Sequence, residues 1–215
     1  KIQLKTTYKK ILSDIYTPVG IYLRLRDRFR DTVLLESTDY HAAENSYSFI
    51  CIHAIGGMEI SNDQQMEFKY PGRPTEKIAL GSASVPSLLW DYMQRFELEP
   101  AGEKPVRTAQ SLFGYTTFDA VRFFDRINLT ETKEEPAIPL MRYRLYQHVI
   151  AIDHFKDELY ICENEVPGIE SELAVVESRI RSKDVPVYPF GVSGEESSNL
   201  TDQEYMDLVE KGIKS

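Results

Sequence analysis

The chain has 215 residues, of which 42% are hydrophobic and 27% are charged, and this composition is typical of a soluble globular protein with one large domain or two small ones. Its formal net charge is −9 and its pI is about 5.1, which argues against nucleic acid or an anionic membrane surface as the main partner. No stretch approaches the roughly 18 consecutive apolar residues of a membrane-spanning helix, and the N-terminus lacks the apolar core of a signal peptide. We therefore expect a cytoplasmic protein.

The first expected elements are a helix and a strand. Thr17 followed by Pro18 has the pattern of an N-cap and a first-turn proline, so we predict a helix over 18–30, although strand-like alternation competes there. The segment 32–38 is rich in β-branched and aliphatic residues and predicts a buried strand.

The next segment predicts a meander of short strands. Aromatic and β-branched residues over 47–55 indicate a buried strand, which we expect Gly56 and Gly57 to end. Short strands over 58–60 and 66–70 are then predicted.

The middle of the chain predicts one helix and three strands. Ser84 and Pro86 precede an apolar face that is typical of an amphipathic helix over 85–98. A loop is expected up to about Arg107. The strands that follow are predicted at 111–124, 140–152 and 158–163.

The C-terminal part predicts two helices joined by a linker. Apolar spacing favours a helix over 168–182, and the segment 184–200 has the Pro, Gly and Ser content of a linker. Thr201 and Glu204 match a capping box, so a helix is expected over 201–215. Because little chain remains to cover its apolar face, we expect its packing partner beyond Ser215.

The two cysteines and four histidines do not have the spacing of a metal or redox site. Cys51 and Cys162 lie far apart inside apolar runs, so we expect two buried free thiols. The spacing of the histidines matches no metal-binding motif. They are His41, His53, His148 and His154.

Motif spacing identifies no catalytic residue. A nucleophile elbow, a Walker loop and a GxGxxG fingerprint are all absent. Asp153 followed by His154 could form an acid–base pair, but we interpret Asp153 as a turn residue because Asp side chains accept hydrogen bonds from the backbone in turns. Catalytic residues and metal ligands are therefore both predicted to be missing.

Several segments resemble the N-terminal domain of anthranilate synthase component I, a chorismate-utilising enzyme. Each segment is short, but together they occur in the expected order and cover the chain from about residue 10. They are Tyr16-Thr-Pro-Val19 with Tyr22-Leu-Arg-Leu-Arg26, Leu34-Leu-Glu-Ser37, Tyr47-Ser-Phe-Ile50, Phe113-Gly-Tyr115 with Phe118-Asp-Ala-Val-Arg-Phe123, and Asp153-His154 at the end of a strand.

The resemblance implies an enzyme of two domains that makes anthranilate and pyruvate from chorismate, the first step of tryptophan biosynthesis. A glutamine amidotransferase, component II, would deliver ammonia, and Mg²⁺ would hold the substrate carboxylate in the second domain. Residues 1–200 are then the N-terminal tryptophan-regulatory domain, and residues 201–215 are the first helix of a truncated chorismate-binding domain. We expect the chain alone to be inactive and to bind no cofactor.

The resemblance also implies half of a feedback site for L-tryptophan. Such a ligand needs an acceptor for its ammonium, a polar contact for its carboxylate and apolar walls for its indole. Strand alternation puts Leu35 and Ser37 on one face and Glu36 on the other, so some contacts must come from the backbone or from a twisted strand end. The positions expected to bind the ligand are Leu35, Glu36, Ser37, Ser46 and Tyr47.

One departure from the family concerns charge. The family often has a basic residue just before its Tyr-Ser-Phe, whereas this chain has Asn45 and Ser46. A neutral hydrogen bond would replace a charge-assisted one, which is roughly twice as strong, so weaker tryptophan binding is expected.

Two alternatives stay open. Aminodeoxychorismate synthase component I shares the architecture and makes a precursor of 4-aminobenzoate, and a free-standing amino-acid-binding regulatory domain would have no catalytic half. The expected fold class is α+β, with antiparallel β-sheets in a sandwich-like arrangement and peripheral helices.

Overall fold

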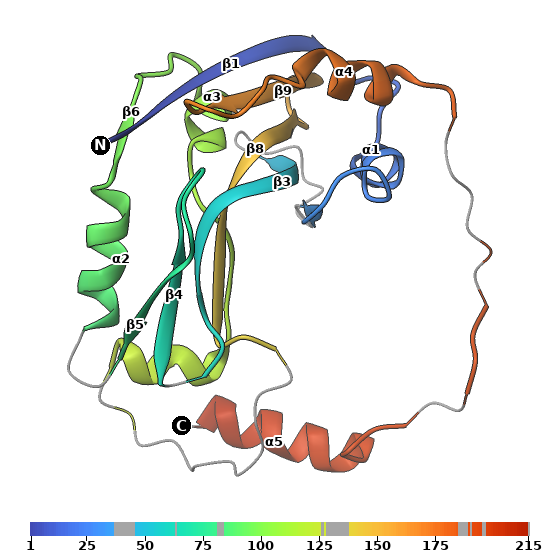
Figure 1. The fold of residues 1–215 in the computed structure, drawn as a ribbon. Coiled ribbons are helices and arrows are strands. Elements are labelled where there is room, and N and C mark those ends of the chain that lie inside the picture. The colour runs from blue at the N-terminus through green and yellow to red at the C-terminus, as the bar shows by residue number, and fades with distance from the viewer. Residues whose placement is uncertain are drawn as a thin grey trace.

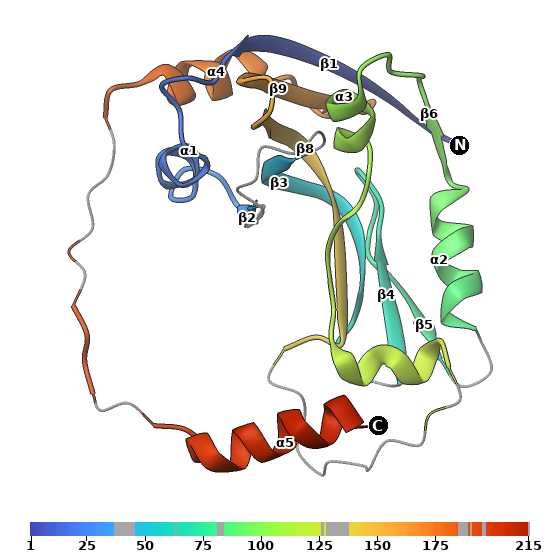
Figure 2. The ribbon, with the colours of Figure 1, turned by 180° about the vertical axis from the view of Figure 1, so that it is seen from behind.

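The computed structural model describes residues 1–36, 46–62, 64–80, 84–125, 127, 138–184, 189, 191–194 and 197–214 (Figures 1 and 2). The strands are β1 (Ile2–Leu12), β2 (Val33–Leu35), β3 (Tyr47–Ile60), β4 (Gln65–Lys69), β5 (Glu76–Ala79), β6 (Phe96–Leu98), β7 (Phe113–Thr116), β8 (Met141–Asp153) and β9 (Glu158–Glu165). The helices are α1 (Pro18–Leu25), α2 (Val85–Met93), α3 (Lys104–Ala109), α4 (Leu173–Arg181), α5 (Asp202–Lys214) and the 3₁₀ helix η1 (Phe118–Phe123).

The described strands form one sheet in the order β5-β4-β3-β8-β9-β1-β6, with β2 also pairing with β3 and β7 with β8. All neighbours are antiparallel except β1 and β6, which run parallel. The sheet bends strongly, so that β1 and β9 cross the top of Figure 1 while β4 and β5 run down its middle. The predicted α+β class with mainly antiparallel strands is confirmed.

The long strands β3 and β8 connect the two halves of the sheet. In the upper half, Tyr47–Ile52 of β3 pairs with β8; β2 flanks β3 and β9 flanks β8. In the lower half, Gly57–Ile60 of β3 pairs with β8; β4 flanks β3 and β7 flanks β8. A β-bulge between Ala54 and Gly56 separates the halves and increases the local bend.

The prediction that Gly56 and Gly57 end a strand is wrong, because both lie inside β3. Gly57 has a φ of +146°, and a Cβ there would lie 2.3 Å from the carbonyl oxygen of Tyr143 on β8. Glycine is needed here because it permits this backbone angle and the close approach of β8.

Helices cover both faces of the upper half. On the face opposite α1 and α4, α3 packs through Val106 and Ala109 against a cluster that contains Cys51 and Cys162. Both cysteines are buried free thiols, as predicted, and burial raises the pKa of Cys162 to about 12, so this thiol stays protonated. Four fully buried side chains attach the other two helices: Ile21 and Leu25 from α1, and Val176 and Ile180 from α4.

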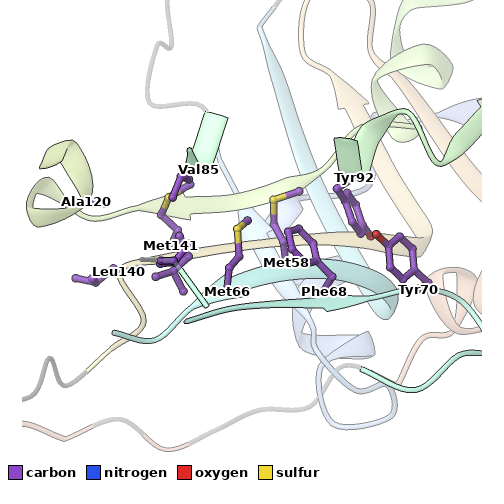
Figure 3. Packing of buried hydrophobic residues seen from close by; sticks show 11 residues of the cluster. Met58, Met66, Phe68, Tyr70, Val85, Tyr92, Ala120, Leu140 and Met141 are labelled. Atoms are coloured by element: carbon purple, nitrogen blue, oxygen red, sulfur yellow. The ribbon is translucent and has the colours of Figure 1, made fainter. Parts of the chain in front are cut away.

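The lower half has its own core against α2. The ring of Tyr92 stacks on those of Phe68 and Tyr70, with centroids 5.6 and 5.0 Å apart, and its hydroxyl donates to the Lys69 carbonyl at 3.0 Å. Figure 3 shows these rings together at one end of the cluster. The methionines of this core are Met58, Met66 and Met141.

Several predicted elements have different ends. Helix α1 ends at Leu25 rather than residue 30, and α2 ends at Met93 because residues 96–98 pair with β1. The predicted strand at 111–124 is wrong beyond Thr116, where η1 follows β7. Helix α4 begins at Leu173 rather than at residue 168.

Three elements were missed entirely, namely β1, β5 and α3, whereas β6 and η1 replace parts of predicted elements of another type. Strand β1 is rich in Lys and Thr and buries only Leu4, so it lacks the apolar alternation of a strand and depends on its pairing with β9. All residues of β5 are exposed. Helix α3 follows Glu103 and includes Pro105 in its first turn, which reads in sequence as a loop.

The capping box at the start of α5 is confirmed. The Thr201 amide donates to Glu204 Oε2 at 2.8 Å, and the Glu204 amide donates to Thr201 Oγ1 at 3.3 Å. None of the described residues of α5 is buried, and Figure 1 shows the helix apart from the sheet. The assignment of residues 201–215 to a second domain stays a prediction.

The described helices include none with the length and apolar character needed to cross a membrane.

Candidate functional site

The predicted ligand positions gather where β2 and β3 pair. Leu34 lies opposite Ile50 and Leu35 opposite Phe49 in this antiparallel pair. The end of β2 therefore lies beside the first residues of β3, next to Ser46 and Tyr47. Ser37, the remaining position of the predicted set, lies outside the described residues.

The predicted positions divide between two faces of the sheet. Leu34 belongs to the core under α1, whereas Val33 packs with Phe49 on the opposite face. Leu35 is two residues after Val33, so it lies on the same face, and it is 37% exposed at the strand end; Glu36 is exposed. Side chains on opposite faces of the strand can contact the same ligand only if the strand end is twisted, as the sequence analysis expects.

An aromatic wall lies beside this strand end. The ring centroid of Phe49 is 6.0 Å from that of Tyr47 and 5.5 Å from that of Phe113. The Lys104 ammonium, from the start of α3, lies 5.6 Å from the Tyr47 ring centroid. This positive charge was missed because the sequence around Lys104 was interpreted as a loop.

The phenol of Tyr47 stays protonated at neutral pH. Burial and the neighbouring Asp153 carboxylate both raise the pKa of Tyr47 above its ordinary value. Tyr47 is therefore a neutral hydrogen-bonding group with an apolar ring, which suits the edge of a site for an aromatic amino acid.

On the α1 face, a Ser–His pair fixes the start of β3. His154 Nε2 lies 2.7 Å from Ser48 Oγ, and the His154 amide donates to the Ser46 carbonyl at 3.1 Å. Such a pair can activate a nucleophile, but Ser48 is fully buried and no substrate can reach its hydroxyl. The pair instead holds the β8–β9 turn against β3.

The turn itself follows the sequence prediction. Asp153 Oδ1 accepts hydrogen bonds from the Phe155 and Lys156 amides, each at 3.1 Å. Asp153 is thus a turn residue, and both of these bonds come from backbone amides rather than from the imidazole of His154.

A second polar cluster lies under the start of α4, and we call it the Glu163 cluster: Glu163, His148, Gln147, Ser171 and Glu172. Glu163 Oε1 lies 2.9 Å from His148 Nε2, and the two side chains are 1% and 0% exposed. The remaining donors to the carboxylate are Ser171 Oγ at 2.5 Å, the Glu172 amide at 2.7 Å and Gln147 Nε2 at 3.4 Å.

Burial and hydrogen bonding set the charges of this cluster. Burial alone would raise the pKa of Glu163, but the bonds from Ser171, Glu172 and His148 lower it below its ordinary value. Burial lowers the pKa of His148, and the Glu163 carboxylate opposes this only in part. Glu163 is therefore ionised and His148 neutral, so the cluster binds α4 to the sheet through donated hydrogen bonds.

No cluster of three or more His, Cys, Asp or Glu groups that could hold a metal ion occurs within the ranges that the structure describes. The Glu163 cluster has the residue types of a ligand set, but its carboxylate oxygens are already occupied by protein donors.

Two curated proteins named anthranilate synthase component 1 are similar to this chain. The one from Spirochaeta aurantia is 26% identical over 186 residues, which cover 84% of this chain and 37% of that protein. The one from Lactococcus lactis subsp. lactis is 24% identical over 170 residues, which cover 76% of this chain and 33% of that protein. This chain thus spans about a third of the length of these relatives.

A crystal structure of anthranilate synthase component I from Streptococcus pneumoniae TIGR4 matches with a TM-score of 0.44 and 17% identity, over 80% of this chain and 35% of that one. No protein-family model matches the chain. The resemblance to anthranilate synthase component I that the sequence motifs indicate is confirmed by the names of the curated relatives.

Proposed function

We propose that this chain is the tryptophan-regulatory part of an anthranilate synthase component I. The observation that carries the proposal is the similarity of most of the chain to about a third of two proteins of that name. The complete enzyme is a lyase that converts chorismate and ammonia into anthranilate and pyruvate, and a glutamine amidotransferase, component II, supplies the ammonia.

The ligand of the β2–β3 site is L-tryptophan. Leu35 and the ring of Tyr47 offer apolar surface to the indole, and the exposed carboxylate of Glu36 attracts the ammonium. Hydroxyls at Ser37 and Ser46 suit the ligand carboxylate. The ammonium of Lys104 adds a positive charge near Tyr47, which supports carboxylate binding although Asn45 and Ser46 replace the basic residue of the family.

The chemistry takes place in the rest of the enzyme. By the family resemblance, the second domain would bind the Mg²⁺ that holds the substrate carboxylate. The chain alone has no turnover. Incubation of the purified 215-residue protein with chorismate, Mg²⁺ and ammonium should yield no anthranilate fluorescence, and measurable formation of anthranilate refutes this part of the proposal.

Inhibition follows from unequal binding to two states of the enzyme. Tryptophan binds the low-activity arrangement better than the active one, so by linkage chorismate weakens tryptophan binding to the same degree. The half-site on this chain has only part of the contacts, so free tryptophan binds it weakly. Calorimetric titration is expected to show no micromolar affinity.

The decisive test is the substitution Ser37→Phe in the complete enzyme. A phenyl group fills the indole space, so inhibition by tryptophan should be abolished while uninhibited turnover stays near that of the parent. Ser87→Phe, at an exposed position of α2, is the matched control and should leave inhibition unchanged. Equal loss of inhibition and turnover in the Ser37 variant contradicts the proposal.

A further inference from the structure

A cavity of about 450 Å³ lies between α2, β6 and the sheet, away from the β2–β3 site. Leu4, Met58 and Leu145 form its base and are nearly completely buried. Its mouth is formed in part by Met93 and Leu98, which are 46% and 49% exposed. The volume is within the range of about 300–1,000 Å³ that is common for small-molecule sites.

One wall of this cavity is rigid before any ligand binds. Tyr92 lines the cavity, its hydroxyl is bonded to the Lys69 carbonyl, and its ring stacks between those of Phe68 and Tyr70. Figure 3 shows Met58 beside this group of rings. A preformed aromatic wall lowers the entropy that binding costs. Met93 at the mouth is unbranched and can adapt to the shape of a ligand.

The chemistry of the lining is uniform. None of the side chains that line the cavity is charged, although 27% of the residues in the chain are Asp, Glu, Lys or Arg. Polar groups other than tyrosines are confined to Gln110 and Ser111. Gln110 Nε2 donates to the Glu99 carbonyl at 2.9 Å, and its Oε1 accepts no hydrogen bond from the described residues. The site therefore disfavours ions and offers one acceptor and one hydroxyl.

We propose that this cavity binds a small uncharged aromatic molecule with one hydrogen-bonding group, whose ring lies against Tyr92 and Met58 and whose polar group faces Gln110 and Ser111. The site is independent of the proposed tryptophan site, because L-tryptophan carries two charges that this lining does not compensate.

The test uses 1-naphthol as the probe and the methionine methyl groups as reporters. The chain has five methionines, so ¹³C-methyl labelling gives five signals in the full 215-residue protein. The signals of Met58 and Met93 should shift together and saturate at one equivalent of probe. The signal of Met206 on α5 should not move.

Two further probes define the chemistry. Naphthalene, which lacks the hydroxyl, is expected to bind about fivefold more weakly, the ratio that one net hydrogen bond provides. Naphthalene-1-sulfonate, which carries a charge, should leave Met58 and Met93 unshifted. Binding of this anion as strongly as 1-naphthol overturns the proposal, since it indicates non-specific apolar association.

A variant that narrows the mouth locates the site. Ser111→Trp is at an exposed position, so the chain should fold, and it is expected to weaken 1-naphthol binding about tenfold or more by steric exclusion. Ser193→Trp, at an exposed position outside the cavity, should bind as the parent does. Unchanged affinity in Ser111→Trp, or displacement of the probe by excess L-tryptophan in the parent, contradicts a separate site.

Discussion

Two glutamates contact side chains of the central strand β8, one in a buried cluster and the other in a partly exposed one. Glu163 of the upper half is 1% exposed, and its partners are His148, Ser171 and a backbone amide. Glu59 of the lower half is 15% exposed and pairs with the guanidinium groups of Arg142 and Arg144 at 2.8 and 2.5 Å. A carboxylate that is buried away from water needs a protein hydrogen-bond donor for each oxygen. A carboxylate that is partly exposed can also accept hydrogen bonds from solvent.

The comparison predicts unequal contributions to stability. Burial removes the alternative of solvation, so loss of one partner in the upper cluster leaves other polar groups unpaired. The lower cluster pairs one carboxylate with two guanidinium groups, but water and salt screen the attraction between them. Stability should therefore depend much more on Glu163 than on Glu59.

The largest effect is expected for Glu163→Leu. It leaves His148 Nε2, Ser171 Oγ and the Glu172 amide without their acceptor, so the free energy of unfolding should fall by about 3–5 kcal/mol. Urea unfolding followed by circular dichroism measures this loss. Glu170→Leu, at an exposed position of the same loop, is the control and should cost less than about 0.5 kcal/mol. Similar losses in both variants contradict the comparison.

The next effect is a pH dependence of the Glu163 cluster. Burial lowers the pKa of His148 below its ordinary value of 6.5, so the folded state favours the neutral ring. The resulting stability is complete above pH 6.5 and is lost as the pH falls below it. Glu163, whose pKa is also lowered, adds a second loss below its ordinary value of 4.5. The other titratable groups near His148 are His53 and Glu172.

His148→Gln separates the two steps. Glutamine can still donate to Glu163 but does not titrate, so the decrease in urea midpoint between pH 7 and pH 5 should become smaller than in the parent. The matched comparison is His154→Gln, which changes an exposed histidine just after β8, and the decrease should be smaller in His148→Gln than in His154→Gln. A parental profile in His148→Gln excludes the buried imidazole as the cause.

A smaller effect is expected for Glu59→Gln. Burial opposes ionisation of Glu59, but hydrogen bonds from Arg142, Arg144 and Ser61 lower its pKa to about 2. The partners are partly in water, so the substitution should cost about 1 kcal/mol, and 1 M NaCl should reduce that difference. The cost of Glu163→Leu should not change with salt. A salt-independent loss at Glu59 contradicts its assignment as a screened pair.

The two clusters also differ in how far the sequence predicts them. The strands at 140–152 and 158–163 and the turn at Asp153 were predicted, and counting five residues from the Asp153–Glu158 pair places His148 opposite Glu163. The ion pairs of Glu59 could not be predicted from the sequence, because Gly57 was interpreted as the end of a strand. The reason that β3 continues is the approach of the Tyr143 backbone, which is a tertiary contact.

The same limit applies to the candidate site. Leu35, Glu36, Ser46 and Tyr47 were proposed from a motif, and both strands were predicted, but the β2–β3 register that brings these residues together was not. Lys104 and the Ser48–His154 pair were missed. Lys104 lies at the start of a short helix whose first turn contains a proline, and the Ser48–His154 pair joins β3 to the β8–β9 turn, a tertiary contact that no motif predicts.

The smallest effect on stability is expected at a third glutamate, which is exposed to solvent. Glu204 accepts from the Thr201 amide and hydroxyl at the start of α5, where no described residue is buried. Thr201→Ala removes the cap and should weaken the helix locally by about 1 kcal/mol, seen as faster amide exchange in 202–208. Because α5 contributes no buried side chain, the global urea midpoint should stay unchanged. A lower midpoint means that α5 packs on the sheet in solution, and stability would then depend on contacts rather than on the burial of each glutamate.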